Sequence, residues 1–175
     1  TVAVSKPTPI FRTLTNNGIH HYPDSAVSLR DAGGNWEVWL AAGTESYRLV
    51  GPSPTQVNLD PGGPILASTD NTGTPHQGYA GITSLVDCQG TLTAFFHAEY
   101  HAIGLQPWAE CPAPYHASMC RAISGDFPYL TPDNPTWFLT SYGTADYGQP
   151  KCAYGAGGGS VFDPGGDYLY LYYYD

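Results

Sequence analysis

One short pattern occurs three times in this chain: a strand of small residues, a glycine-rich turn, and an aromatic strand that ends on a polar residue. The copies lie at residues 24–42, 80–99 and 157–175. Their turn glycines are about 55 to 75 residues apart, which is near the spacing of the repeats in β-propellers. The repeat therefore predicts blades arranged around a common axis rather than a single sandwich.

The composition favours an all-β chain. The 21 Gly and 16 Pro interrupt the sequence, helical periodicity is almost absent, and the aromatic residues form short alternating runs. We predict a single propeller-like domain over residues 1–175, with blade repeats near 20–70, 76–130 and 136–175. Three antiparallel hairpins are predicted, which join residues 25–30 with 36–42, 80–86 with 91–98, and 158–162 with 168–174.

The number of repeats is small for a propeller. The chain contains about two and a half blades, whereas a propeller typically has at least about four. We therefore expect that the protein continues beyond Asp175, or that another chain supplies the missing blades. In the alternative, the three hairpins close into a smaller sandwich.

Charge and cysteine content restrict the partners and the compartment. With 6 Lys and Arg against 15 Asp and Glu, the net charge of −9 opposes binding to nucleic acid or to an anionic membrane. No apolar run approaches the length that spans a bilayer, and no leader begins at Thr1. Four cysteines and few lysines fit a secreted protein.

The cysteines suggest two disulfides. Cys111 and Cys120 bracket a proline-containing loop that a disulfide can staple, and Cys88 and Cys152 would then pair across blades. Four cysteines allow three connectivities, between which the sequence does not choose. The alternative is that some of them are buried free thiols.

Polar residues gather at one end of the predicted hairpins. In an antiparallel hairpin, the start of the first strand and the end of the second lie at the same end of the ladder. If the hairpins share one polarity, these ends form one face. The residues expected on or near it are His20, His21, Asp24, Glu45, Arg48, His76, Gln77, His97, Glu99, His101, Tyr154 and Asp175.

A family resemblance is carried by short motifs. In the first repeat they are Tyr22-Pro-Asp24 with the residues up to 27, and segments 36–43, 46–48, 51–54 and 63–66. These resemble the first blade of the five-bladed propeller glycoside hydrolases, the group of arabinanases, xylosidases and fructosidases. Residues 95–99 and 168–175 look like inner aromatic strands of later blades in that group.

The resemblance implies a role for Asp24 as the first-blade carboxylate, which acts as base or nucleophile. The family's other two acids usually stand where this chain has the glycine-containing segments 77–81 and 155–159, so they have no clear match. Glu99 is the available substitute. The resemblance also implies a calcium or sodium ion on the propeller axis, and no other cofactor is expected.

Asp24 and Glu99 are therefore the predicted catalytic pair, because a glycosidase needs two carboxyl groups beside the scissile bond. Strand alternation places His97 and Glu99 on one side, and an acid beside aromatic surface is expected to have a raised pKa. The alternative is that Glu99 pairs with Arg121 or Arg48. A transition metal on His97, Glu99 and His101 is disfavoured, because the two histidines are about 13 Å apart along an extended strand, unless the strand ends at Glu99 and the chain turns.

The remaining candidates concern binding. The predicted substrate-binding residues are His21, Arg48, His76, His97, His101, Trp108 and Asp175. For Arg48 an ion pair with Glu45 is the favoured alternative. For the tyrosines of residues 168–174, packing between blades is favoured over sugar stacking.

Three functions remain open at this point. The leading hypothesis is a secreted glycoside hydrolase that acts on a saccharide. The second is a carbohydrate-binding propeller without catalysis, which the missing family acids favour. The third is a structural subunit that self-associates through the aromatic edge strand of residues 168–174.

Overall fold

The computed structural model describes residues 19, 23, 27–69, 76–101, 115–126, 129–139, 153–155 and 157–174. The described part of the chain is all-β, as predicted, and no helix occurs in it. Several predicted site residues lie outside these ranges: His20, His21, Asp24, Trp108, Cys111, Cys152 and Asp175.

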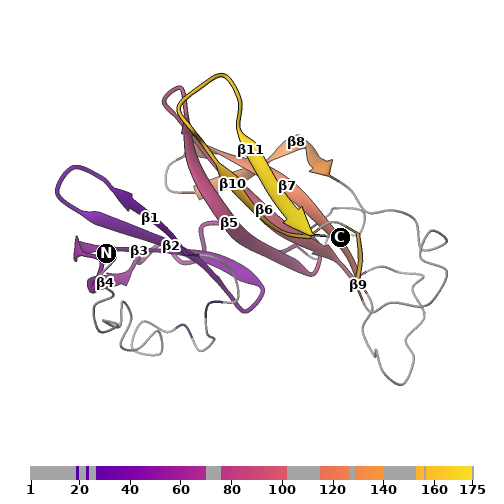
Figure 1. Cartoon of the computed structure of the whole chain (residues 1–175). Helices are drawn as coiled ribbons and strands as arrows, with labels where there is room; N and C mark the ends of the chain where they lie inside the picture. Colours follow the sequence, from indigo (N-terminus) through magenta and orange to yellow (C-terminus); the bar gives the residue numbers. More distant parts are fainter. Residues whose placement is uncertain are drawn as a thin grey trace, which may run out of the picture.

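Three sheets make up the described part of the fold (Figure 1). The first is antiparallel and contains β1 (Ser28–Asp31), β2 (Trp36–Ala42), β3 (Glu45–Ser53) and β4 (Gln56–Leu59), in that order. The central sheet contains β5 (Tyr79–Cys88), β6 (Thr91–Tyr100), β7 (Tyr115–Asp126) and β8 (Tyr129–Leu139), while β9 (Ala153–Gly155) pairs parallel with β7. The third is the hairpin of β10 (Gly157–Phe162) and β11 (Tyr170–Tyr174).

The three predicted hairpins are confirmed as β1–β2, β5–β6 and β10–β11. Each turn repeats one device, in which an aspartate carboxylate accepts a hydrogen bond from the N–H of a glycine with positive φ. Glycine adopts this backbone conformation without the steric cost that a side chain imposes. The pairs are Asp31 with Gly33, Asp87 with Gly90, and Asp163 with Gly165.

Alternating residues of the central sheet point to two different neighbours. Phe96 is fully buried against Trp39 of the first sheet, in a core that also includes Ile82. Phe95 points to the opposite face and packs with Met119 of β7 and Val161 of β10. The central sheet is therefore covered on one face by the first sheet and on the other by the β10–β11 hairpin, and the described sheets do not close into a ring.

A buried serine joins the first sheet to the free edge of β5. The Ser46 hydroxyl donates to the Ala80 carbonyl oxygen and accepts from the Ile82 N–H, both at 2.8 Å. Ser46 has no exposed surface. One hydroxyl thus satisfies the hydrogen bonds of two backbone groups on the edge strand β5. This explains why a polar side chain is buried between the two sheets.

Replacing Ser46 by alanine is expected to lower the free energy of unfolding by about 1–3 kcal/mol, because both hydrogen bonds are lost in a buried place. Urea denaturation measures this. The matched control is Ser53→Ala, whose hydroxyl reaches only Thr55 on the surface, and its effect is expected within about 0.5 kcal/mol. Equal effects would contradict the bridging role of Ser46.

The structure contradicts the predicted disulfides, since Cys88 and Cys120 are free thiols. Cys120 lies opposite Phe96 in the β6–β7 ladder and points into the core between the first and central sheets. Burial raises the pKa of its thiol to about 12. The side chain is thus an unreactive part of the core, which is the alternative that the sequence had left open.

Candidate functional site

The site is built on the end of β6. Glu99 lies there with its carboxylate between two imidazoles: Nε2 of His97 is 3.1 Å from Oε1, and Nε2 of His101 is 2.9 Å from Oε2. β6 ends at Tyr100, so the distance expected for a strand extended through residue 101 does not apply. The structure brings together three of the predicted residues, with Glu99 at their centre.

The hydrogen bond at Nδ1 of His97 shows which of the two ring nitrogens carries the proton. The N–H of Gly158, at the start of β10, donates to His97 Nδ1 at 3.0 Å. A nitrogen that accepts this bond carries no proton, so in the neutral ring the proton is on Nε2 and points at Glu99. Glu99 thus receives a hydrogen bond from His97.

The pKa of Glu99 is lowered, not raised as the sequence had suggested. Burial alone would raise it, but hydrogen bonds from His97 and His101 and their electrostatic attraction outweigh that effect. The expectation was wrong because the nearest groups to the carboxylate are hydrogen-bond donors rather than aromatic surface. Glu99 is therefore an ionised acceptor at neutral pH.

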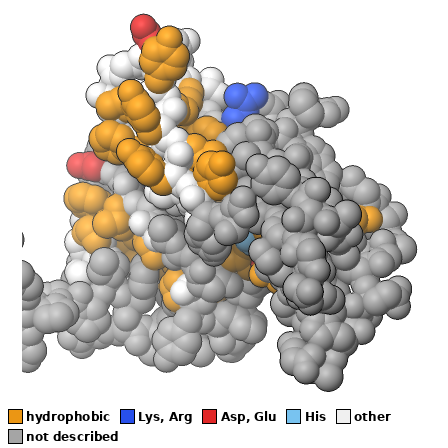
Figure 2. Space-filling model, turned by 45° about the vertical axis from the view of Figure 1, so that its right-hand side comes forward, with side chains coloured by type: hydrophobic (Ala, Val, Ile, Leu, Met, Phe, Trp, Pro, Cys, Tyr) orange, Lys and Arg blue, Asp and Glu red, His pale blue; other side chains and the backbone are white. Residues whose placement is uncertain are grey.

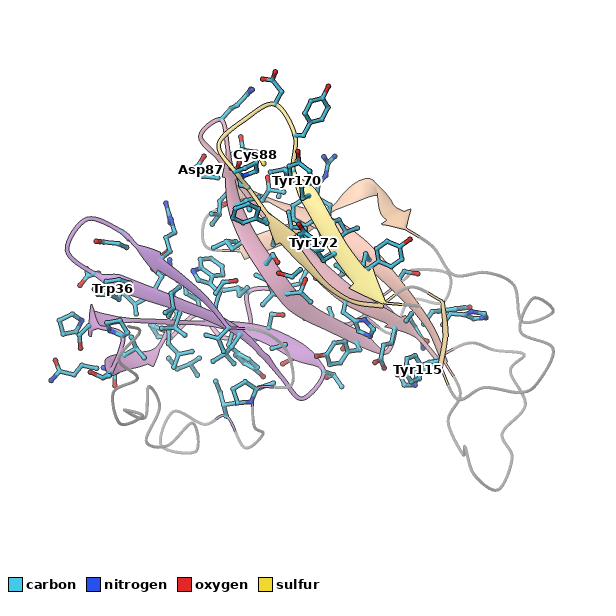
Figure 3. The ribbon with its side chains drawn as sticks, viewed as in Figure 1. Trp36, Asp87, Cys88, Tyr115, Tyr170 and Tyr172 are labelled. Carbon is cyan, nitrogen blue, oxygen red and sulfur yellow. The ribbon has the colours of Figure 1, made fainter. Side chains whose placement is uncertain are left out.

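Aromatic rings flank the three polar residues. The Tyr79 ring meets His97 edge-on with centroids 5.5 Å apart, and His101 stacks on Tyr115 with centroids 5.4 Å apart. Figure 3 shows Tyr115 at the end of the central sheet that is remote from Asp87 and Cys88. We refer to His97, Glu99, His101, Tyr79 and Tyr115 as the Glu99 cluster.

Two glycines make room for these rings. A Cβ at Gly78 would lie 1.9 Å from the His101 ring, and one at Gly81 would lie 2.3 Å from the Tyr79 ring. Tyr79 and Tyr115 were not among the site residues predicted from the sequence. The hairpin register could have predicted Tyr79, because Tyr79 begins β5 and lies directly opposite Glu99 on β6.

Arg48 belongs to a different network. Its Nε donates to Asp60 Oδ2 at 2.9 Å and its Nη1 to Glu37 Oε1 at 3.0 Å, while the guanidinium lies over the Trp39 ring. Arg48 thus links Glu37 and Asp60 within the first sheet, and its contact with a substrate stays a prediction. Glu45, the alternative partner, accepts a hydrogen bond from the Tyr47 hydroxyl at 2.8 Å.

His76 is likewise separate from the Glu99 cluster. Its ring meets Phe96 edge-on with centroids 6.0 Å apart, and Phe96 points to the opposite face of the central sheet from Glu99. Burial lowers the pKa of His76. This predicted substrate contact is therefore placed in the packing between the first and central sheets.

The tyrosine side chains of β11 that the structure describes are exposed, and their packing between blades stays a prediction. Tyr170 and Tyr172 are 52% and 64% exposed, and Phe162 beside them on β10 is 57% exposed. Figure 2 shows the resulting hydrophobic surface. Leu171 of this strand packs on the central sheet, through the Phe95 core.

Comparison of the chain with protein-family models, curated proteins and solved structures finds no match. Among the described residues, no helix is long and apolar enough to cross a membrane. Nor does that part of the chain contain a group of three or more His, Cys, Asp or Glu side chains arranged to hold a metal ion. The functional proposal therefore depends on the Glu99 cluster itself.

Proposed function

We propose that this protein binds a saccharide at the Glu99 cluster. The observation that carries the proposal is a carboxylate held between two imidazoles, each of which packs against a tyrosine ring: His97 against Tyr79 and His101 against Tyr115. A sugar offers hydroxyl donors to a carboxylate and C–H faces to aromatic rings, so this combination of groups suits it. The acceptor is charged, which strengthens each hydrogen bond that it receives.

Hydrolysis is the second candidate, and the lowered pKa of Glu99 favours one version of it. An ionised carboxylate serves as nucleophile or base, whereas the leaving group needs a protonated acid. In this version Glu99 takes the role first expected of Asp24, and Asp24 becomes the candidate acid. Asp24 lies outside the described residues, so no distance between the two carboxyl groups supports hydrolysis. Binding is therefore the stronger proposal.

The proposed fold is a five-bladed propeller of which the three sheets are consecutive blades. Support comes from the central sheet, which has a neighbouring sheet on each face, as an inner blade does. The protein is secreted in this proposal, and further blades or a second copy complete it. Calcium or sodium would occupy the axis, while nucleic acid and membranes are not partners.

Saccharide binding is tested by titrating a panel of neutral oligosaccharides into the protein and into Glu99→Gln. The variant keeps the shape of the side chain and removes its charge, so binding should weaken about tenfold or more. Glu45→Gln is the matched control, because Glu45 lies outside the cluster and contacts Tyr47.

Each result has a distinct meaning. Binding without turnover of aryl glycosides supports the binding protein, and turnover that Glu99→Gln abolishes supports the hydrolase. If the protein binds no oligosaccharide, or if Glu99→Gln binds as the parent does, the proposed site is wrong.

A further inference from the structure

His97 connects two strands that are far apart in the sequence. On β6, its Nε2 lies 3.1 Å from Glu99 Oε1, and across the sheets its Nδ1 accepts the Gly158 N–H at 3.0 Å. Gly158 lies in β10, the strand that begins the third sheet. One imidazole therefore ties the Glu99 carboxylate to the β10–β11 hairpin.

Only the neutral ring can form both contacts. Neutral imidazole has one N–H and one lone pair, and here the lone pair faces Gly158 while the N–H faces Glu99. A second proton would enter at Nδ1. It would then point at the Gly158 N–H, so two donors would face each other and the contact would be lost.

We propose that His97 is a proton-operated latch: the neutral ring holds the start of β10 on the central sheet, and the protonated ring releases it. Histidine is the side chain whose charge ordinarily changes between pH 5 and 8. The latch is thus closed while the ring is neutral and open once the ring is protonated. The proposal rests on the contacts of His97 with Glu99 and Gly158 and not on the identity of a ligand.

The groups around His97 act in opposite directions. Glu99 favours the protonated ring, as the anion next to it, and His101 shares that carboxylate. The Gly158 N–H opposes protonation, and Arg121 is the cation of β7 that lies on the same face of the sheet. The Tyr79 ring of β5 meets the His97 ring edge-on. β10 contains no ionisable residue, and the ionisable residues of β11 are all tyrosines.

A second hydrogen bond holds β10 on the central sheet and involves no group that titrates. It therefore provides an internal reference for the exchange of the Gly158 amide. The Val161 N–H donates to the Ser84 hydroxyl at 2.7 Å, and Val161 packs in the Phe95 core. Opening of the latch should therefore free Gly158 while Val161 stays in place. The two amides lie on one strand, so local unfolding of the whole hairpin would affect both.

The test follows both amides by NMR hydrogen exchange between about pH 7.5 and 5, the range in which histidine titrates, and corrects the rates for intrinsic pH dependence. Protection of Gly158 should fall about tenfold as His97 becomes protonated, while protection of Val161 stays constant. Nitrogen chemical shifts of the His97 ring should show the proton on Nε2 above the transition. Loss of protection at both amides, or a neutral ring with its proton on Nδ1, would overturn the proposal.

Two variants sharpen the result. His97→Gln keeps an acceptor within reach of Gly158 but does not titrate, so any protection of Gly158 should become independent of pH. Glu99→Gln removes the anion that favours protonation, and the transition of Gly158 should move to lower pH. If His97→Gln retains the parent's pH dependence, His97 is not the latch. Should that variant fail to fold, exchange at the Gly158 and Val161 amides of the parent, together with the nitrogen shifts of its His97 ring, still tests the proposal.

Discussion

Replacing Trp39 by alanine is expected to lower the free energy of unfolding by about 3–5 kcal/mol. Trp39 has no exposed surface and fills the core between the first and central sheets together with Phe96 and Ile82. Removal of the indole leaves a large cavity at the place where the two sheets meet. Equilibrium denaturation in urea measures the loss.

Leu29→Ala is the matched control for this prediction. Leu29 is a large apolar residue of the same sheet but is 47% exposed on β1. A surface substitution of this kind usually changes stability by no more than about 0.5 kcal/mol. If both variants lose the same stability, the contact between the first and central sheets does not contribute as described.

Arg48→Met should cost about 3 kcal/mol, the second largest effect expected. The guanidinium links two carboxylates, Glu37 and Asp60, and the side chains of Arg48 and Glu37 are only 12% and 5% exposed. Methionine keeps most of the apolar stem but leaves two mostly buried anions without their shared cation. Arg30→Met is the control, because Arg30 also pairs with Glu37 but is 36% exposed, and its loss should cost about 1 kcal/mol or less.

The same network predicts a loss of stability in acid. Burial alone would raise the pKa of Asp60, but hydrogen bonds from Arg48 and the Gly62 N–H hold it below the usual value. A carboxyl whose pKa is lower in the folded state stabilises the fold above its unfolded pKa, and this contribution is lost as the pH falls through the folded pKa. The free energy of unfolding should therefore fall below about pH 4, and less steeply in Arg48→Met. Parallel pH profiles of the parent and the variant would show that Arg48 does not hold the Asp60 charge.

Local chemistry accounts for what was predictable about the fold. The hairpins follow from an aspartate and a glycine at each turn, and from alternation in the strands beside it. Both features act within about ten residues of each other, so they can be read without knowledge of the rest of the chain. The same alternation correctly placed His97 and Glu99 on one face of their strand.

Contacts between distant segments account for what was not predictable. The proton position on His97 depends on Gly158, which is 61 residues away, and the pKa of Glu99 depends on which ring nitrogens face its oxygens. The partners of Arg48 depend on the pairing of β2, β3 and β4 rather than on the nearest acid in sequence.

The sequence by itself thus determined an all-β chain of hairpins with a polar cluster at the end of one of them. Tertiary structure alone decided that the sheets stack with the β5–β8 sheet in the middle, that Cys120 is buried as a free thiol, and that Glu99 is ionised. The physical reason is range: turns and strands are set by neighbouring residues, whereas burial, hydrogen-bond partners and charge state are set by groups that only folding brings within a few ångströms.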